Sequence, residues 1–427
     1  MRRASGLLLL LLLAALALAA AKRRRERKVR TDVPSLVWHA PFFSGGGYCS
    51  EATAFVVALD DMRLDVAIEM HGDSHNNDYI NGLNPTTLGR LYTLSGRAAK
   101  GGHQDVAICH SEPGAWHVPT PSWPSSPCPR PRTRNGGPYY VVGRTMFETD
   151  RLPDGWADRL NKVDEVWVPT DFHKAIFEDA GVLNVKIVGE PVDTERFTPE
   201  GPTYDIASDE FLVLSVFKWE RRKGWDILLR AWHKAQIDGI LVIVTNAYHS
   251  SADFAKQIET YVTDSLGDDR GLAALGKVKI LSGLSDADME ALYRRADLVA
   301  LPTRGEGWGR PHVEAMASGT PIVATNWSGP TAYLDDSVGF PLAWTGLEPV
   351  GEGPFASHEW AAPDAAHLAA IFAEAVADPA RLKALGAAAR RRMVERYAPG
   401  VLAAEVQSHL KRIRGAVEAR RGEGGEL

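Results

Sequence analysis

The most constraining feature of this sequence is an alternation of short apolar segments with helical stretches, which begins near Ser35 and runs twice along the chain. In the first half, the segments that predict strands are residues 36–41, 64–70, 105–109, 139–142, 165–169 and 185–188. In the second half they are residues 211–216, 240–245, 278–282, 298–301 and 321–325. Such alternation is typical of parallel sheets with crossover helices. It predicts an α/β protein with two doubly wound, Rossmann-like domains facing each other across a cleft.

The length of the chain supports two domains, because 427 residues are too many for one ordinary hydrophobic core. Residues 190–202 are rich in Pro, Gly and charged residues, which is typical of a linker between domains. We therefore predict a first domain over residues 31–195 and a second over residues 203–395. A C-terminal helix and tail follow over residues 396–427.

The N-terminal 30 residues read as a targeting segment. An uncharged run of Leu and Ala over residues 7–21 is followed by a strongly basic stretch over residues 22–28. The run is shorter than the ~20 residues that span a bilayer, and the small residues Ala17 and Ala19 suit a signal peptidase. The basic flank instead favours a short anchor held on the cytosolic side. We predict targeting to the endomembrane system (ER/Golgi) or the secretory pathway, by a cleaved signal peptide or an anchor with membrane association.

The charge balance argues against nucleic-acid binding. Residues 1–30 hold nine of the 48 Lys and Arg residues but one of the 54 Asp and Glu residues, so the rest of the chain is acidic. A nucleic-acid-binding body would instead show a basic stripe or patch. Nucleic acid is therefore not predicted as a partner.

Several features leave the cellular compartment open. Cys49, Cys109 and Cys128 form no obvious disulfide framework and no zinc-binding pattern. A glycosylation sequon over residues 326–328 follows the last strand, where a glycan would crowd the predicted ligand site. Either the sequon is unused or this domain faces the cytosol. Residues 119–138, rich in Pro, Ser and Arg, predict an exposed insertion or lid.

Two patterns that contain metal-binding residue types are better explained otherwise. The run from His71 through Asp73 to His75 follows a strand, but no third ligand accompanies it. Asp286 and Asp288 lie in the first turn of a predicted helix, where acidic residues are favoured by the helix dipole. No metal site is predicted.

A strand, a turn and a helix in the second domain carry the strongest functional signal. Residues 296–303 predict a buried strand, and residues 311–318 predict a helix that ends before Gly319. Glu306 lies in the turn between them and Glu314 one helical turn further on, with seven residues between the two carboxylates. Ligands of open α/β sheets bind at the carboxyl ends of the strands. Both residues are therefore candidates for ligand binding.

Two lysines follow the first strand of the second domain. Lys218 and Lys223 are expected at the same edge of the sheet as Glu306, since each follows the carboxyl end of a strand. Two ammonium groups there could neutralise a departing diphosphate. Considered alone, the basic residues 218–223 would form a solvated turn. Because they are expected beside Glu306, they instead indicate phosphate binding.

The first domain offers weaker candidates at its matching edge. Gly45, Gly46 and Gly47 follow the first strand and open a helix, so their backbone can approach a ligand closely. His110 ends a strand, where it could orient or deprotonate a hydroxyl group. Each signal also has a structural explanation, as an ordinary turn and as a packed histidine.

Three motifs together resemble the retaining glycosyltransferases of family 4, which have the GT-B fold. They are EGWGRPHVEAMASGTPIVA over residues 306–324, KWERRKG over residues 218–224, and MFETDR over residues 146–151 with DEVWVPT over residues 164–170. The resemblance covers nearly everything from residue 37 to residue 393.

The resemblance implies a role for each matching residue. Glu306 would face the donor sugar, Glu314 the ribose of the nucleotide, and Lys223 the diphosphate. Lys218 stands where the family often has arginine, which keeps the charge but loses the bidentate fork. Further donor contacts would come from the turn residues Gly307, Trp308 and Gly309. In the first domain, on the acceptor side, residues 45–47 match the loop near the diphosphate and acceptor, and His110 falls near the active-site histidine of the family.

The resemblance also implies the reaction. The expected activity moves a hexose from a nucleotide-diphosphate sugar, UDP- or GDP-linked, to a hydroxyl group of a glycan, lipid or protein acceptor, with retention of configuration and without a metal. No protein nucleophile is needed if the departing phosphate oxygen accepts the proton of the acceptor. Two alternatives remain open: a nucleotide-sugar epimerase or hydrolase, and a membrane-tethered pseudoenzyme that binds nucleotide sugar or glycan.

Overall fold

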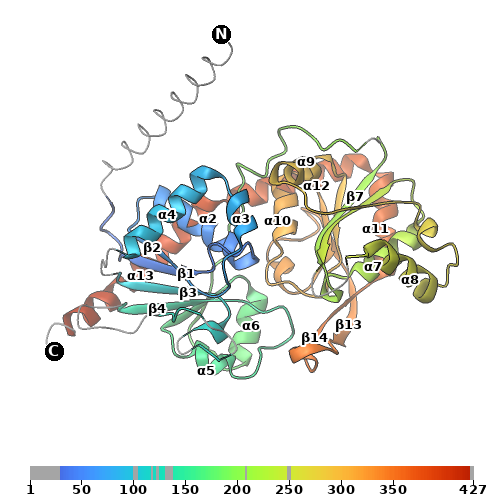
Figure 1. The fold of residues 1–427 in the computed structure, drawn as a ribbon. Coiled ribbons are helices and arrows are strands. Elements are labelled where there is room, and N and C mark those ends of the chain that lie inside the picture. The colour runs from blue at the N-terminus through green and yellow to red at the C-terminus, as the bar shows by residue number, and fades with distance from the viewer. Residues whose placement is uncertain are drawn as a thin grey trace, which may run out of the picture.

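The computed structural model describes residues 29–99, 104–116, 119–121, 125–129, 138–206, 209–247 and 252–423. Within them the chain forms two α/β domains that lie side by side, each built on its own parallel sheet (Figure 1). The predicted fold class is confirmed. In the described part of the chain, no helix is both long enough and apolar enough to cross a membrane. The predicted targeting segment lies almost wholly outside the described residues.

The first sheet has the strand order β2-β1-β3-β4-β5-β6, and every pairing in it is parallel. Its strands are β1 (Leu36–Ala40), β2 (Val66–Met70), β3 (Val106–His110), β4 (Tyr140–Arg144), β5 (Glu165–Val168) and β6 (Val185–Ile187). All five residues of β1 and of β3 are buried, because helices cover both faces of the sheet. The helices are α2 (Gly47–Asp61), α3 (Asn77–Gly82), α4 (Pro85–Ala99), α5 (Trp156–Leu160) and α6 (Asp171–Asp179).

The second sheet repeats this plan with the order β12-β11-β10-β7-β8-β9, also fully parallel. Its strands are β7 (Leu212–Trp219), β8 (Ile240–Ala247), β9 (Lys277–Leu281), β10 (Leu298–Leu301), β11 (Ile322–Thr325) and β12 (Phe340–Leu342). Its helices are α7 (Trp225–Ala235), α8 (Phe254–Leu266), α9 (Asp286–Arg295), α10 (Arg310–Ala317), α11 (Ala365–Ala377) and α12 (Pro379–Arg392). Because β10 pairs directly with β7, the turns that follow these two strands meet at one edge.

All eleven predicted strands are present, and β7 departs most from its prediction because it continues to Trp219. Three strands were missed. The strand β12 has only three residues, and β13 (Trp344–Pro349) pairs antiparallel with β14 (Glu359–Pro363) in a hairpin outside the main sheet. The residues of β13 are exposed or half-buried, so they lack the apolar run that marks a buried strand.

The hairpin of β13 and β14 reaches the first domain. The backbone N–H of Asp150 donates to the carbonyl oxygen of Glu359 at 2.9 Å, and the N–H of Glu359 donates to Oδ1 of Asp150 at 2.7 Å. Beside them, the Thr149 hydroxyl lies 2.7 Å from Nδ1 of His358. The two domains are thus joined by direct hydrogen bonds between residues 149–150 and 358–359 as well as by the linker.

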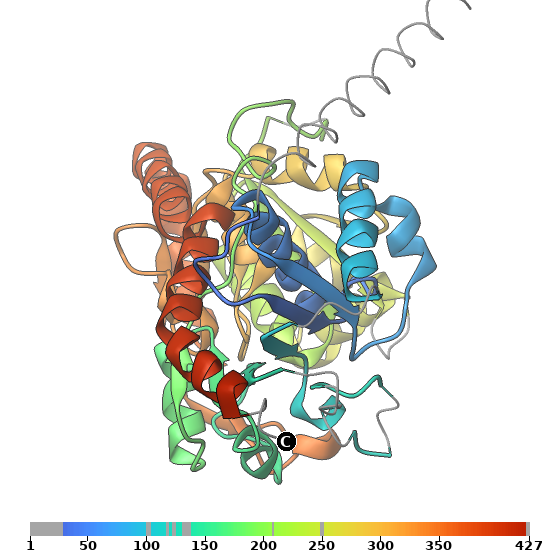
Figure 2. The same ribbon diagram turned by 90° about the vertical axis from the view of Figure 1, so that its left-hand side faces the viewer.

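The last helix, α13 (Pro399–Glu423), returns to the first domain (Figures 1 and 2). It packs against α2 and buries an apolar stripe of Leu402, Val406, Leu410, Ile413 and Val417. Two ion pairs join the carboxyl half of α13 to the start of β5: Arg412 with Glu165 at 2.7 Å, and Arg420 with Asp164 at 2.7 Å. The spacing of the stripe is that of an amphipathic helix.

Candidate active site

A cleft of about 410 Å³ lies between the two domains, at the carboxyl ends of their strands. Residues that follow β7 and β10 line it from the second domain, and residues that follow β3 and β4 line it from the first. This is the edge at which open α/β sheets bind ligands, because the turns there are free to carry functional side chains.

Glu306 and Lys223 meet inside this cleft. Nζ of Lys223 donates to both carboxylate oxygens of Glu306, at 2.7 and 2.9 Å. The backbone N–H of Glu306 donates to the Ser328 hydroxyl at 2.9 Å, which fixes the turn after β10. The predicted meeting of these two residues, 83 positions apart, is therefore present in the structure.

A glycine permits this close approach. Gly224 has a positive φ of 68°, ends the short helix of residues 221–223 and begins α7. A Cβ atom at this position would overlap the carbonyl oxygen of Pro302, at the end of β10. Only a residue without a side chain fits against the backbone here. The turn that carries Lys223 can thus lie directly against the turn that carries Glu306.

The environment of Glu306 favours its ionised form. The side chain is 8% exposed, and burial alone would raise its pKa. The charges of Lys223 and Arg222 outweigh burial and hold the pKa of Glu306 at about 2. Burial and the neighbouring Arg222 in turn lower the pKa of Lys223. The cleft therefore contains a fixed carboxylate at neutral pH.

Arg222 also lines the cleft, although the sequence pattern did not single it out. Its Nη1 donates to Glu306 Oε2 at 3.2 Å and to the carbonyl oxygen of Gly305 at 2.7 Å, and lies 3.7 Å from Glu148 of the first domain. It thus connects the walls of the cleft. Its position in the basic run of residues 218–223 was the available signal, but the sequence does not show which cations of such a run turn inward.

The other predicted residues of the second domain divide into two groups. Lys218, Gly307, Trp308 and Gly309 all line the cleft. Glu314 does not: its carboxylate accepts a hydrogen bond from the Tyr293 hydroxyl at 3.1 Å and lies 3.8 Å from Nε of Arg310. Of the two candidate acids, only Glu306 therefore lines the cleft, because α10 turns the Glu314 side chain toward α9. A ribose contact of Glu314 stays a prediction.

Of the three glycines predicted to approach a ligand, Gly45, Gly46 and Gly47, only Gly47 lines the cleft. Gly45 has a φ of 79° and lies against the ring of Tyr79, and Gly46 is the N-cap residue of α2. These two glycines shape the turn rather than its ligand surface. Tyr48 follows them and faces the cleft, with its hydroxyl 3.1 Å from that of Thr145.

His110 does not reach the cleft, contrary to the prediction. Its side chain is fully buried, Nδ1 accepts from the Trp38 indole N–H at 3.0 Å, and Nε2 lies 2.9 Å from Glu51. Glu51 also pairs with Arg144 at 2.7 Å; burial opposes ionisation, but Arg144 and His110 hold the pKa of Glu51 at about 2. His110 belongs to a buried network beneath α2, because the last residue of β3 points toward that helix.

Three buried polar side chains on the cleft wall lack a hydrogen-bond partner among the described residues. They are Glu190 at Oε1, Trp308 at Nε1 and His312 at both ring nitrogens, with residue exposures of 2%, 2% and 1%. Buried polar groups are normally paired, so such atoms call for a ligand or ordered water. Burial raises the pKa of Glu190 well above its usual range and lowers that of His312 to about 4, which favours the neutral form of each.

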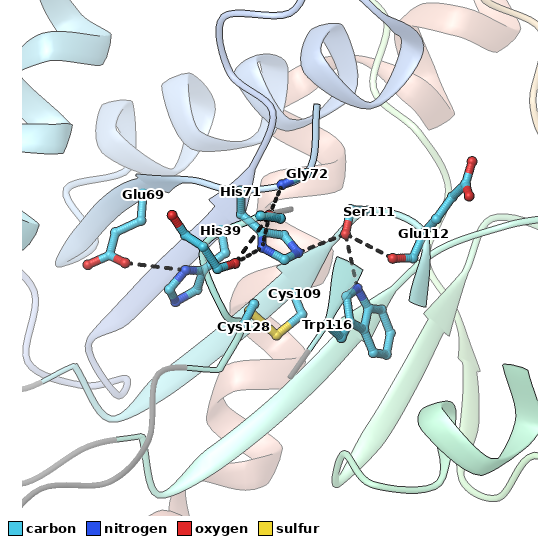
Figure 3. The surroundings of a disulfide bond; sticks show 11 residues. His39, Glu69, His71, Gly72, Cys109, Ser111, Glu112, Trp116 and Cys128 are labelled. Atoms are coloured by element: carbon cyan, nitrogen blue, oxygen red, sulfur yellow. Dashed lines mark hydrogen bonds and ion pairs between the residues drawn. A yellow bond between two sulfur atoms is a disulfide. The ribbon is translucent and has the colours of Figure 1, made fainter. Parts of the chain in front are cut away.

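A disulfide joins Cys109 in β3 to Cys128 in the first domain (Figure 3). The sequence had suggested no such pair. Around it, His71 Nδ1 lies 2.6 Å from the carbonyl oxygen of Ser126, and His71 Nε2 lies 2.8 Å from the Ser111 hydroxyl. The Trp116 indole donates to the same hydroxyl at 3.1 Å. The bond therefore ties part of the predicted insertion, which is described over 119–121 and 125–129, to the end of β3.

This arrangement also occupies the histidine that was considered as a metal ligand. His71 uses both ring nitrogens in the contacts just described, and the His75 ring stacks on Phe43. Within the described ranges, no group of three or more His, Cys, Asp or Glu residues is arranged to hold a metal ion.

Two family models match the sequence. Residues 200–341 match glycosyl transferases group 1, and residues 283–406 match family 4 glycosyltransferases in conflict systems. A similar curated protein is the D-inositol 3-phosphate glycosyltransferase of Mycobacterium tuberculosis, 30% identical over 217 residues. The match takes in 49% of this chain but only 40% of that protein, so the chain spans less than half the length of this relative.

Solved structures share the fold over nearly the whole chain. Anabaena HepE, solved in complex with UDP and glucose, covers 89% of this chain over its own full length, with a TM-score of 0.62 and 16% identity. Sucrose-phosphate synthase from Thermosynechococcus elongatus covers 90% of this chain over its own full length, with a TM-score of 0.60 and 15% identity. At such identity the likeness concerns the fold.

Proposed function

We propose that the chain is a family 4 glycosyltransferase of GT-B fold, which transfers a hexose from a nucleotide-diphosphate sugar to an acceptor hydroxyl group with retention of configuration. One observation carries the proposal. Lys223 holds the buried carboxylate of Glu306 by two hydrogen bonds, inside a cleft whose opposite wall comes from the other domain. A fixed cation beside a fixed anion suits a reaction in which an anionic group leaves and positive charge develops on the sugar.

In the proposed mechanism, residues of the second domain act on the donor. Lys218, Lys223 and the N-terminal end of α10 offer positive charge to the diphosphate as it departs. Glu306, ionised at neutral pH, faces the sugar and stabilises an oxocarbenium-like transition state. The departing phosphate oxygen accepts the proton of the incoming hydroxyl on the same face, so configuration is retained without a protein nucleophile. Contact between the domains excludes water.

The donor is proposed to be a UDP- or GDP-sugar that is used without a metal ion. The orphaned polar atoms of Trp308 and His312 supply hydrogen-bonding capacity for its sugar and phosphate groups. HepE, which shares the fold, was solved with UDP, which supports testing UDP-sugars first.

The purified full chain should be tested against common nucleotide sugars, with EDTA present and absent. The cognate nucleotide at 100 times its Kd is expected to stabilise the folded state by about 2.7 kcal/mol, and nucleotide release is expected to require an acceptor. Thermal unfolding measures the first result and a nucleotide-release assay the second. Release without any acceptor would favour a hydrolase, and binding without release a pseudoenzyme. If no nucleotide protects the protein, the proposed function fails.

We further propose that the folded domains lie in the lumen of the endomembrane system. The disulfide between Cys109 and Cys128 supports this, because such bonds persist in oxidising compartments and are rare in the cytosol. A C-terminally tagged protein in intact microsomes is expected to resist added protease until detergent is supplied. Digestion of the tag without detergent would place the domains in the cytosol instead.

A further inference from the structure

The two walls of the cleft differ in charge. Among the described residues that line it, the second domain contributes the four cations Lys218, Arg222, Lys223 and Arg310 and the two acids Glu220 and Glu306, whereas the first domain and linker contribute no Lys, Arg or His. They contribute four carboxyl groups instead, those of Glu51, Glu112, Glu148 and Glu190, together with the rings of Tyr48, Phe147 and Trp156. The basic wall suits the diphosphate of a donor, so the acidic and aromatic wall is left for the acceptor.

The four carboxyl groups are not equally compensated. Glu51 is paired with Arg144 and His110, and Glu148 lies 3.7 Å from Arg222. Glu112 has no side-chain hydrogen bond to any described residue, although it is half-buried at the edge of the cleft. Burial and the nearby charges of Glu148 and Asp73 raise the pKa of Glu112 to about 7. Near neutral pH its carboxyl group is therefore present in both protonation states, and can donate or accept a hydrogen bond.

The position of Glu112 is fixed by its neighbours. It follows Ser111, whose hydroxyl receives hydrogen bonds from the Trp116 indole and contacts His71 Nε2 (Figure 3). The disulfide at Cys109 ties down the same strand end. The backbone that carries Glu112 is thus held in place, while its carboxyl group has no hydrogen-bond partner among the described residues, so the group is positioned for a ligand.

Glu190 gives independent evidence that a polar ligand binds in the cleft. Glu190 is 2% exposed, lines the cleft, and has an oxygen without a hydrogen-bond partner among the described residues. Burial favours its neutral form, which can donate to a hydroxyl oxygen. Two acids that can share hydrogen bonds with hydroxyl groups, set among aromatic rings, match the surface of a sugar with its polar edges and apolar faces.

On this basis, and resting on the proposed transferase activity, we propose that the acceptor is an uncharged carbohydrate whose hydroxyl groups bind Glu112, and that acceptors bearing phosphate are rejected. A phosphate on this wall would meet the charges of Glu148 and the nearby Asp73, and that of Glu112 in its ionised form. The cations closest to these acids, Arg222 and Lys218, belong to the opposite wall, where the diphosphate of the donor would occupy them. Like charges brought together in a cleft are a common means of excluding a wrong partner. The inference separates this chain from the relative whose name specifies an inositol phosphate.

The test compares acceptors that differ only in charge. With the active donor, the full chain is assayed on glucose, mannose, N-acetylglucosamine and myo-inositol, on their monophosphates, and on glucosamine as a cationic counterpart. At least one uncharged acceptor is expected to react with a kcat/KM about 100-fold above that of its phosphate. A Glu112→Gln change is expected to raise the acceptor KM about tenfold with little change in protection by the nucleotide. A Glu112→Lys change should reduce the discrimination against phosphate.

The matched control is Glu178→Lys, which makes the same charge change at an exposed position on α6 of the same domain, and is expected to alter none of these values. The inference is overturned if the wild-type protein uses a phosphorylated acceptor as well as its parent sugar, if glucosamine is preferred through its charge, or if both Glu112 variants keep the wild-type KM and charge preference. Failure of the proposed function looks different, because then no nucleotide protects the protein and no acceptor reacts at all.

Discussion

A Glu306→Gln variant is expected to lose transfer activity by about 10²- to 10³-fold while its affinity for the nucleotide changes only a few fold. Glutamine has nearly the same shape but no charge, so it cannot stabilise positive charge that develops on the sugar. The nucleotide would still contact Lys218 and Lys223 in the same cleft. Turnover with a fixed donor and acceptor measures the first effect, and thermal protection by the nucleotide measures the second.

Glu314→Gln provides the matched control for this variant, since Glu314 belongs to the same motif but lies off the cleft, against Tyr293 and Arg310. Its turnover is expected to stay within about tenfold of wild type, with any loss appearing in donor binding. If Glu306→Gln turned over at the wild-type rate, the assignment of this carboxylate to the reaction would be wrong.

The Glu306→Gln variant also tests whether the pKa of Glu306 is lowered in the folded protein. Because the pKa of Glu306 is held at about 2 rather than 4.5, its ionisation contributes stability that is complete above pH 4.5 and is lost as the pH falls toward 2. A difference of this size corresponds to about 3 kcal/mol. The free energy of unfolding of wild type should therefore fall more steeply over this acidic range than that of Glu306→Gln.

Replacing Lys223 with Met is expected to lower kcat/KM by about 100-fold or more and to weaken protection by the nucleotide. Two effects combine. The diphosphate loses a cation in the cleft, and the buried carboxylate of Glu306 loses both hydrogen bonds that Lys223 supplies, which leaves it to Arg222 alone. Steady-state kinetics with varied donor measure the loss, and thermal unfolding without ligand measures the accompanying destabilisation.

Lys234→Met is the control for Lys223→Met, because Lys234 is exposed near the end of α7, the helix that follows the Lys223 turn. It should leave kinetics and stability close to wild type. Wild-type turnover in Lys223→Met would mean that the cation observed in the cleft serves only to hold the fold together.

The meeting of Lys223 and Glu306 could be predicted from the sequence because it depends on a general property of parallel sheets. Both residues follow the carboxyl end of a strand, and every such end in one sheet opens on the same edge. The sequence did not reveal that β7 and β10 are neighbours, since two strands intervene along the chain. The general property of parallel sheets was enough to predict that the two turns lie at one edge.

The details that the sequence did not predict depend on the direction of single side chains. In a strand buried on both faces, such as β3, apolar residues do not alternate with polar ones, so nothing indicates which way His110 points. It lies under α2, whereas Glu112, two positions further on, lines the cleft. The disulfide likewise joins two residues 19 positions apart, and the segment between them has no periodic pattern that would predict how the chain folds back. Such features follow from tertiary packing rather than from local pattern.

The route of the chain has a practical consequence for dissecting this protein. It passes from the first domain to the second at the linker, and then back again when α13 lies down on α2. A single truncation after residue 195 would therefore strip the N-terminal half of a helix that covers its own apolar surface, and would leave that helix hanging from the other half. To express the halves separately, the chain should be divided both at the linker and before α13, and α13 should be fused to the N-terminal half.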